Sequence, residues 1–248
     1  MLKKRQNSHI TQKGLLMLLY QPDGGYCYNS DSILLYGFIS RFAPKGKMLD
    51  VGAGSGIVGL LIGRDFPAVR VEAVEKQPLY AEFARRNAAI NHIGYTLHEG
   101  DFLELGAHGS YDWIVSNPPF YHENVSRSEN PILHQARYNV HLPIEPFMSK
   151  ISKLLKSNGE AVICYDARQF VQLCTACERS RLRVVDVQFV HSKEDRPSTL
   201  VMLHLKKNSK AMLNIYPPLI TFSDECYTPA VQAIYDKAKV HSIKCPSI

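Results

Sequence analysis

The sequence has few of the features that mark membrane and secreted proteins. Among its 248 residues, no run reaches the length and apolarity of a membrane-spanning helix. The apolar stretch 15–20 is too short for a secretory core, and no small-residue cleavage site follows it. We therefore expect a cytoplasmic protein that does not enter a membrane.

Signals for metals and disulfides are also scarce. The six cysteines are scattered, and Cys174 and Cys177 have no second Cys or His pair nearby, so reduced thiols are expected. The ten histidines show no ligand spacing, and no metal is predicted. Low-complexity stretches and internal repeats are absent too. With 45% apolar residues, the chain is expected to form one substantial globular domain.

Charge is unevenly distributed along a chain whose net charge is +6. Residues 1–40 carry four basic and two acidic side chains, 41–165 carry thirteen of each, and 166–248 carry twelve and eight. The basic excess therefore lies in the flanks. Because phosphate contacts supply most non-specific affinity for nucleic acid, we expect the flanks to contact RNA. An ordinary solvated basic surface is the alternative.

Strands and helices alternate through the middle of the chain. Strands are expected at 47–52, 69–75, 95–99, 111–116 and 160–165, and helices at 32–42, 56–65, 78–91, 144–156 and 167–180. Such alternation predicts a mostly parallel sheet with helices on both faces. Strands at 182–191 and 199–206 flank a short link and should form an antiparallel hairpin. A short helix is expected near 228–239.

The motif Asn117-Pro118-Pro119-Phe120 follows an apolar strand, with Tyr121 next to it. A conjugated amino group is a poor nucleophile, and two acceptors that hold its hydrogens favour a pyramidal nitrogen. The Asn117 side-chain oxygen and a carbonyl of Pro118 or Pro119 are the candidates, because proline fixes φ and cannot donate. Phe120 or Tyr121 offers a ring for a flat substrate. The alternative is a plain strand-ending turn.

A glycine-rich turn lies about sixty residues upstream, where Asp50 precedes Gly52, Gly54 and Gly56. Glycines let a ligand approach the backbone, and the helix after them exposes unpaired N–H groups. An acid before the glycines suits a ligand that carries an ammonium and a sulfonium group, whereas a pyrophosphate would not favour it. A nucleotide-binding oxidoreductase remains the rival, to be decided by testing both cofactors.

Acidic residues end the next two strands. Glu75, followed by Lys76, ends the strand at 69–75 and can accept from two ribose hydroxyls. Asp101 can accept from an adenine amino group, with Phe102 against the ring. Because ligands of open α/β sheets bind at the carboxyl ends of the strands, these residues are expected near the glycine turn.

The ordered set of glycine turn, Glu75, Asp101 and Asn-Pro-Pro-Phe resembles the class I S-adenosylmethionine (SAM) methyltransferases that act on amino groups. The resemblance implies a Rossmann-like fold with a mostly parallel seven-stranded sheet and a terminal antiparallel hairpin. It also implies SAM as cofactor. The cofactor-binding candidates are Asp50, Gly52, Gly54, Gly56, Glu75, Lys76, Asp101, Phe102 and Asn117, and the catalytic candidates are Asn117, Pro118, Pro119 and Phe120.

Narrower motifs resemble the bacterial tRNA1(Val) (adenine37-N6)-methyltransferase family. These motifs lie at 22–35, 77–91, 135–137, 195–198 and 227–229. The resemblance implies that Tyr26 and Asp31 help close the cofactor site, and that the substrate is adenine 37 in the anticodon loop of valine tRNA. Implied substrate contacts are Tyr121, Arg137, Lys193 and Arg196.

The expected organisation is an entry segment with a capping helix at 1–45, a catalytic core at 46–206 and a basic extension packed on it at 207–248. A monomer is favoured. Alternatives keep the cofactor and change the target: the glutamine N5 of a peptide-release factor, or another RNA or DNA base. A SAM-binding RNA module without catalysis is disfavoured, because a pure binder has no need of an amino-group clamp.

Overall fold

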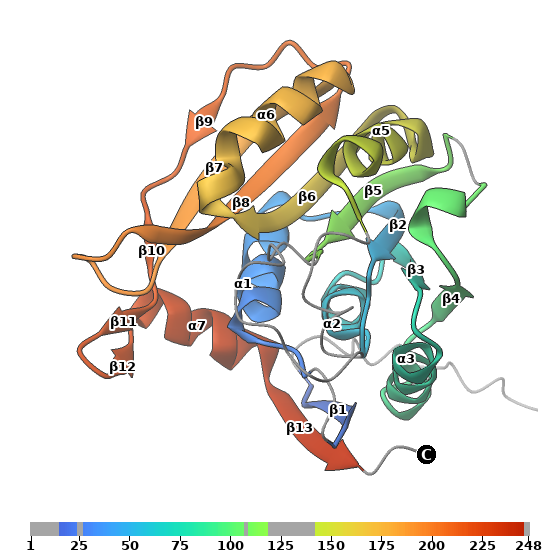
Figure 1. Ribbon diagram of the computed structural model, residues 1–248. Helices are drawn as coiled ribbons and strands as arrows, with labels where there is room; N and C mark the ends of the chain where they lie inside the picture. Colours follow the sequence, from blue (N-terminus) through green and yellow to red (C-terminus); the bar gives the residue numbers. More distant parts are fainter. Residues whose placement is uncertain (1–14, 24–26, 107–108, 119–141, 246–248) are drawn as a thin grey trace, which may run out of the picture.

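The computed structural model describes residues 15–23, 27–106, 109–118 and 142–245. A nine-stranded sheet forms the centre of this part of the chain. Its seven longer strands lie in the order β4 (Tyr95–Glu99), β3 (Val69–Glu75), β2 (Gly46–Val51), β5 (Tyr111–Ser116), β6 (Leu155–Asp166), β8 (Ser198–Lys207) and β7 (Leu182–His191) (Figure 1).

The strand directions agree with the sequence. Strands β4, β3, β2, β5 and β6 pair in parallel, whereas β8 is antiparallel to both β6 and β7. The antiparallel hairpin is therefore confirmed. The C-terminal extension adds two short strands at the β7 edge, β9 (Asn214–Ile215) and β10 (Leu219–Ile220). A two-residue strand has no periodicity, so the sequence pattern did not predict either one.

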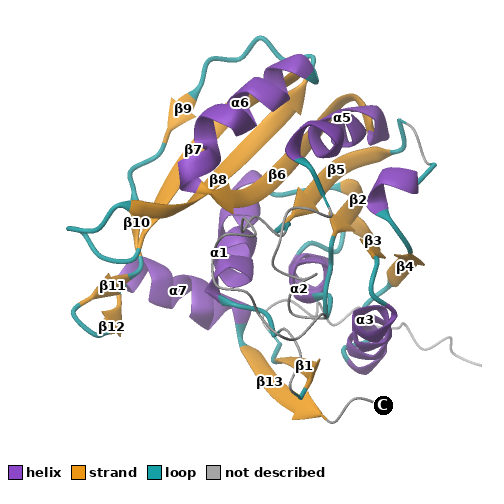
Figure 2. Cartoon of the chain, viewed as in Figure 1, coloured by secondary structure: helices purple, strands orange, loops and turns teal. Residues whose placement is uncertain are grey.

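Helices cover both faces of the sheet (Figures 1 and 2). On one face lie α1 (Ser30–Ile39), α2 (Ile57–Asp65) and α3 (Pro78–Ile90), with α7 (Pro229–Ala238) packed on α1. On the other face, α5 (Ile144–Leu154) and α6 (Phe170–Arg179) pack on each other. Helix α5 buries an apolar stripe at Phe147, Met148, Ile151 and Leu154, which is the spacing of an amphipathic helix.

Two expected boundaries are wrong. The helix expected over 144–156 ends at Leu154, and Ser157-Asn158-Gly159, read as its stop signal, lies inside β6. The ladder between β5 and β6 shifts register there, so the glycine marks an irregularity in a strand. The helix expected from residue 167 begins with a short 3₁₀ turn, Ala167–Gln169, and α6 starts at Phe170.

The two terminal segments pair with each other away from the main sheet. Strand β1 (Met17–Pro22) runs parallel to β13 (Val240–Cys245), and a separate hairpin joins β11 (Phe222–Ser223) to β12 (Cys226–Tyr227). Arg64 of α2 fastens both ends, because its guanidinium donates to the carbonyls of Leu15 at 2.8 Å and Ala238 at 2.6 Å. No local pattern predicts β1 and β13, because each strand depends on a partner at the far end of the chain.

This topology fixes where a ligand can bind. From β2 the chain turns towards β3 on one side, whereas β5 lies on the other side of β2. The carboxyl ends of β2 and β5 therefore flank the point where the strand order reverses, which is the usual ligand site of open α/β sheets. In the described part of the chain, no helix is long and apolar enough to cross a membrane.

Candidate active site

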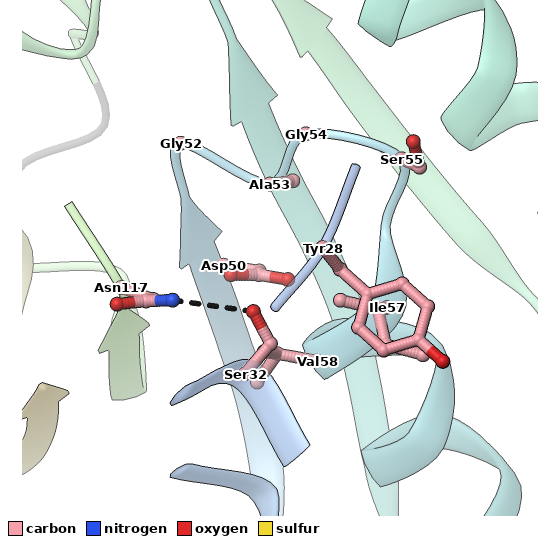
Figure 3. A pocket seen from close by; sticks show the side chains of 10 residues that line it. All are labelled: Tyr28, Ser32, Asp50, Gly52, Ala53, Gly54, Ser55, Ile57, Val58 and Asn117. Atoms are coloured by element: carbon pink, nitrogen blue, oxygen red, sulfur yellow. Dashed lines mark hydrogen bonds between the residues drawn. The ribbon is translucent and has the colours of Figure 1, made fainter. Parts of the chain in front are cut away.

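A pocket opens at the carboxyl ends of β2 and β5 (Figure 3). It spans about 430 Å³ of space between protein atoms, part of which is open solvent. In Figure 3 the glycine loop lies above the pocket, Ser32 and Val58 below it, Asn117 on one side and Tyr28 on the other. Its lining residues are Tyr28, Ser32, Asp50, Gly52, Ala53, Gly54, Ser55, Ile57, Val58 and Asn117.

The glycine loop bends in a way that requires glycine. Gly52 and Gly54 have φ angles of +68° and +55°, and a Cβ built on either meets no atom of the protein within 4 Å. Backbone alone thus faces the open pocket at these two positions. Gly56 differs, because it precedes α2 and a Cβ there would lie 3.2 Å from Leu60.

Asp50 is buried at the end of β2 and binds the start of α2. The amide of Gly59 donates to its Oδ2 at 2.8 Å, which satisfies one of the unpaired N–H groups of the helix N-terminus. Burial, and secondarily the charge of Glu75, raises the pKa of Asp50 to about 7. Proximity to a cation would return this carboxyl to its ionised form.

Glu75 holds the glycine loop from the neighbouring strand. Its Oε2 accepts from the Gly54 amide at 2.8 Å and its Oε1 from the Gln77 amide at 2.9 Å. Burial raises the pKa of Glu75, and the backbone donors oppose that shift. Each carboxylate oxygen has a second lone pair, so the group can still accept hydroxyl hydrogens of a ligand.

Asp50 lines the pocket and Glu75, outside the lining, bonds the glycine loop, so the two carboxylates would favour a cationic ligand. Within the described residues, neither Asp50 nor Glu75 is ion-paired with a lysine or arginine; their partners are backbone amides. The Tyr95 hydroxyl is buried without a hydrogen-bond partner there, and burial followed by the charges of Asp50 and Glu75 raises its pKa. A ligand with an ammonium and a sulfonium group would supply the missing positive charge.

Asn117 lies where β5 ends, opposite this acidic side. The Ser116 hydroxyl donates to the Val51 carbonyl at 2.8 Å and so fixes the end of β5 against β2. The Asn117 Nδ2 donates to the Ser32 hydroxyl of α1 at 3.2 Å. Its Oδ1 is buried and has no hydrogen-bond partner among the described residues. An unpaired buried acceptor is costly, so this oxygen is poised to take an N–H from a ligand.

The structure places other predicted residues beside the pocket. Asp31 precedes Ser32 in α1 and accepts from the Asn29 Nδ2 at 2.6 Å, and burial raises the pKa of its carboxyl. Lys76 and Asp101 pair with each other at 2.8 Å. Asp101 also accepts from the Leu103 amide and so caps a short 3₁₀ turn, Phe102–Glu104.

Phe102 belongs to the core. Only 5% of it is exposed, and its ring packs edge-on against Phe147 of α5 at 5.6 Å between centroids. Asp50, Gly52, Gly54 and Asn117 lie in the pocket lining. The other predicted cofactor residues that the structure describes lie outside it: Asp31, Gly56, Glu75, Lys76, Asp101 and Phe102. The predicted residues Tyr26, Pro119, Phe120, Tyr121 and Arg137 lie outside the described part of the chain, and Pro118 is its last residue before the gap at 119–141.

Lys193 and Arg196 lie in the turn that joins β7 to β8. The turn closes with the Arg196 amide donating to the Lys193 carbonyl at 3.1 Å, and both side chains are exposed. Because β7 is parallel to β6, this turn is at the same edge of the sheet as the pocket. Four strand spacings separate β7 from β2, which places the turn roughly 20 Å to the side.

Six pocket residues were not among the predicted site residues: Tyr28, Ser32, Ala53, Ser55, Ile57 and Val58. Ala53 and Ser55 lie between the predicted glycines, and Ile57 and Val58 begin the helix after them, so their place in the motif was the available signal. Tyr28 and Ser32 lie in the entry segment, whose approach to the pocket depends on the folded chain. Among the described residues, no group of three or more His, Cys, Asp or Glu side chains is arranged to hold a metal ion.

Comparison with known proteins shows which family the chain resembles. The family model "Methyltransferase small domain" matches residues 29–172. A tRNA1(Val) (adenine(37)-N6)-methyltransferase of Porphyromonas gingivalis is 30% identical over 181 residues, covering 67% of this chain and 70% of the relative. The enzyme of that name from Flavobacterium psychrophilum is 31% identical over 188 residues, covering 72% and 79%.

Solved structures share the fold at low sequence identity. A predicted O-methyltransferase from Agrobacterium tumefaciens superposes with a TM-score of 0.67 at 19% identity, covering 86% of this chain and 99% of that one. Fold and pocket together define a SAM-dependent methyltransferase. The chain belongs to the methyltransferase small-domain proteins and, among them, to the tRNA1(Val) (adenine(37)-N6)-methyltransferase family.

Proposed function

We propose that this methyltransferase transfers a methyl group from SAM to the exocyclic N6 of adenine 37 in tRNA1(Val). The observation that carries the proposal is the buried, unpartnered Oδ1 of Asn117 beside a cation-preferring pocket. An amino group with two N–H donors satisfies that acceptor. The names of the relatives supply the substrate.

Some residues of the site would bind the cofactor, and others would orient the target amine. SAM, when bound, supplies an electrophilic methyl carbon on a sulfonium. Asp50 and Glu75 would hold its ammonium and its ribose hydroxyls. Asn117 Oδ1 and the Pro118 carbonyl would each accept one N–H of the adenine amino group, which directs the nitrogen lone pair at the methyl carbon.

The bond changes balance without a strong base. A nitrogen–carbon bond forms as the sulfur–carbon bond breaks, and the sulfur takes that electron pair. The alkylated nitrogen is then acidic, and it loses one proton to water. Positioning by Asn117, rather than proton abstraction, would therefore set the rate.

The target base must leave its stack to reach the pocket. Bases of an RNA loop are splayed out at small cost, which fits an anticodon-loop substrate. From the sequence, we propose that Phe120 or Tyr121 stacks on the base and that Arg137 contacts RNA. We further propose that Lys193 and Arg196 contact phosphates, since their turn is exposed at the same edge of the sheet as the pocket.

The proposal also covers the cellular location, the oligomeric state and the domain organisation of the enzyme. We propose that it acts in the cytoplasm as a monomer. We also keep the organisation expected from the sequence, with an entry segment at 1–45, a methyltransferase core at 46–206 and a basic extension at 207–248. Contacts of β9 and β10 with β7 support the packing of that extension on the core.

The test uses transcripts of tRNA1(Val) that differ only at position 37. The enzyme is incubated with labelled SAM and either the adenine-37 transcript or one with guanine at that position. Label in the first and none in the second is expected. Equal label in both transcripts would assign the activity to another nucleotide. A purified release factor is tested in parallel, and label in it alone would show that the enzyme methylates a glutamine side chain instead.

A further inference from the structure

Strand β1 is joined to the glycine loop through one buried side chain, Asn87 of α3. The Tyr20 amide donates to Asn87 Oδ1 at 2.7 Å, and Asn87 Nδ2 donates to the Tyr20 carbonyl at 2.9 Å. The side-chain amide thus pairs with β1 as a neighbouring strand would. The same Nδ2 also donates to the Ser55 carbonyl at 2.9 Å. Asn87 is fully buried, and its bond to Ser55 is buried at both ends, whereas Tyr20 is partly exposed.

The next residue of β1 is joined to a different wall of the pocket. The Tyr28 amide donates to Gln21 Oε1 at 2.7 Å, and Gln21 Nε2 donates to the Ser242 hydroxyl of β13 at 2.6 Å. Only 2% of Gln21 is exposed. Ser242 lies opposite Leu19 in the parallel β1–β13 ladder. One buried amide therefore connects the C-terminal strand to the segment that carries Tyr28.

Tyr28 and Ser55 both line the pocket, on separate segments (Figure 3). Neither Asn87 nor Gln21 is among the lining residues. We infer that the β1–β13 pair is a frame that sets the spacing of the glycine loop and the Tyr28 segment, with Asn87 and Gln21 as positioning residues for the cofactor. Both would act through the backbone they hold.

Strand β1 is held by its ladder with β13, by Asn87 and Asn91 of α3, and by its own buried Met17 and Leu19. A two-stranded pair is only marginally stable by itself, so its place depends on what it docks against. Losing one partner of a buried hydrogen bond leaves the other unsatisfied, which is more costly than the bond itself. Loss of Asn87 leaves the Ser55 carbonyl unsatisfied as well as the Tyr20 backbone, and loss of Gln21 leaves the Tyr28 amide unsatisfied. The Ser55 and Tyr28 segments are therefore expected to shift.

Asn91 supplies a matched control on the same helix. It docks β1 in the same manner one turn further along, with the Leu18 amide donating to its Oδ1 at 3.0 Å and its Nδ2 donating to the Leu18 carbonyl at 2.7 Å. Its remaining bond is to the Asn87 carbonyl, not to the glycine loop. Loss of Asn91 should therefore weaken the docking of β1 without releasing a pocket wall.

The test measures SAM affinity by calorimetry on the full chain, well below each variant's melting temperature. Asn87→Ala and Gln21→Met should each weaken binding about five- to tenfold, the loss expected for one buried hydrogen bond and its unsatisfied partner. Asn91→Ala should lower the melting temperature as much as Asn87→Ala and leave SAM affinity within twofold.

Two results would overturn the inference. If Asn91→Ala weakens SAM binding as much as Asn87→Ala, the effect follows lost stability and not the frame. If Gln21→Met binds SAM like wild type, Gln21 does not position Tyr28, and this variant decides the point even where Asn87→Ala fails to fold. The inference rests on the cofactor site alone, so failure of the tRNA assignment would leave it intact.

Discussion

The two sides of the pocket are built in different ways. On the glycine-loop side, contacts join residues close in sequence: the Gly59–Asp50 bond spans 9 residues and the Gly54–Glu75 bond spans 21. On the Asn117 side, the bond to Ser32 spans 85 residues. The first side presents buried carboxylates, whereas the second presents a neutral amide and a hydroxyl.

This difference between the two sides suggests that one side binds the cofactor and the other side orients the substrate amine. Charge is suited to holding a cationic cofactor, because a buried carboxylate gains most from a cation. A neutral acceptor is suited to a substrate amine, since it orients N–H bonds without removing a proton. Changes on the acidic side should therefore alter cofactor affinity, and changes on the amide side should alter turnover.

The largest effect is expected for Asn117→Ala, on the amide side of the pocket. Removing the acceptor should lower turnover at saturating substrates at least about 100-fold, the usual effect of losing one preorganised group. SAM affinity should stay within twofold, because the carboxylates remain. Single-turnover methylation and calorimetry measure the two quantities. A variant that methylates at near wild-type rate would remove Asn117 from the reaction.

Glu75→Ala tests the opposite side. Both carboxylate oxygens accept backbone amides, and the Gly54 amide would lose its partner. Hydrogen bonds to charged groups contribute about 1.5–3 kcal/mol, so SAM affinity should fall roughly 10- to 100-fold. Turnover at saturating SAM should change far less. Unchanged affinity in calorimetry would contradict the placement of Glu75 in the cofactor site.

The pKa of Asp50, about 7, predicts a pH dependence. A carboxyl whose folded pKa lies above its unfolded value destabilises the apo protein increasingly as pH rises from 3.8 to 7, and fully above 7. Asp50→Asn should therefore raise the apo melting temperature more at pH 8 than at pH 5.

SAM affinity should also depend on the ionisation of Asp50, but it should increase with pH, whereas the stability of the apo protein decreases. The ionised form is the one that attracts an ammonium, so wild-type affinity should rise between pH 6 and pH 8, and Asp50→Asn should abolish that rise. Calorimetry across this range measures both. Parallel pH profiles for the wild type and the variant would show that Asp50 does not titrate on binding.

Ser32→Ala tests whether the hydrogen bond from Asn117 to Ser32 matters for turnover. The change removes the acceptor for the Asn117 Nδ2, so the amide loses its fixed orientation. Turnover should fall roughly five- to tenfold, in line with about 1 kcal/mol for a hydrogen bond, while SAM affinity is nearly unchanged. Ser32→Thr keeps the hydroxyl and should restore most activity. Equal losses in both variants would point to packing instead.

The smallest effect is expected for Lys193→Ala and Arg196→Ala. Exposed phosphate contacts are screened by salt, so each change should raise the KM for tRNA only a few-fold at physiological ionic strength. The salt dependence of tRNA binding should become shallower. Turnover and SAM affinity are the controls and should not move. An unchanged KM and salt slope in the double variant would exclude this turn from the interface.

The same comparison explains what could be predicted from the sequence. The glycine loop, Asp50 and Glu75 lie within one strand–helix–strand unit, where the bonds from the two carboxylates to the backbone join residues close in sequence. The opposite wall needs α1 to dock on the end of β5 and β1 to pair with β13, whose Gln21–Ser242 bond spans 221 residues. No local pattern encodes such a pairing, so the entry motif indicated the segment without showing the contacts of Tyr28 and Ser32.

Lys76, Asp101 and Phe102 illustrate a second limit. Their places at strand ends favoured a cofactor role, but strand ends also need capping, charge pairing and core residues. Asp101 caps a turn and pairs with Lys76, while Phe102 packs on α5. Sequence position predicted their places at strand ends but not these contacts, and a cofactor role for the three residues stays a prediction.

The most direct test of the central claim is methyl transfer from labelled SAM to unmodified total tRNA, followed by nucleoside mass spectrometry. The wild-type enzyme is compared with Asn117→Ala. The account predicts N6-methyladenosine in valine tRNA with the wild type and none above background with the variant. Label in another nucleoside, or equal N6-methyladenosine from both proteins, would contradict it.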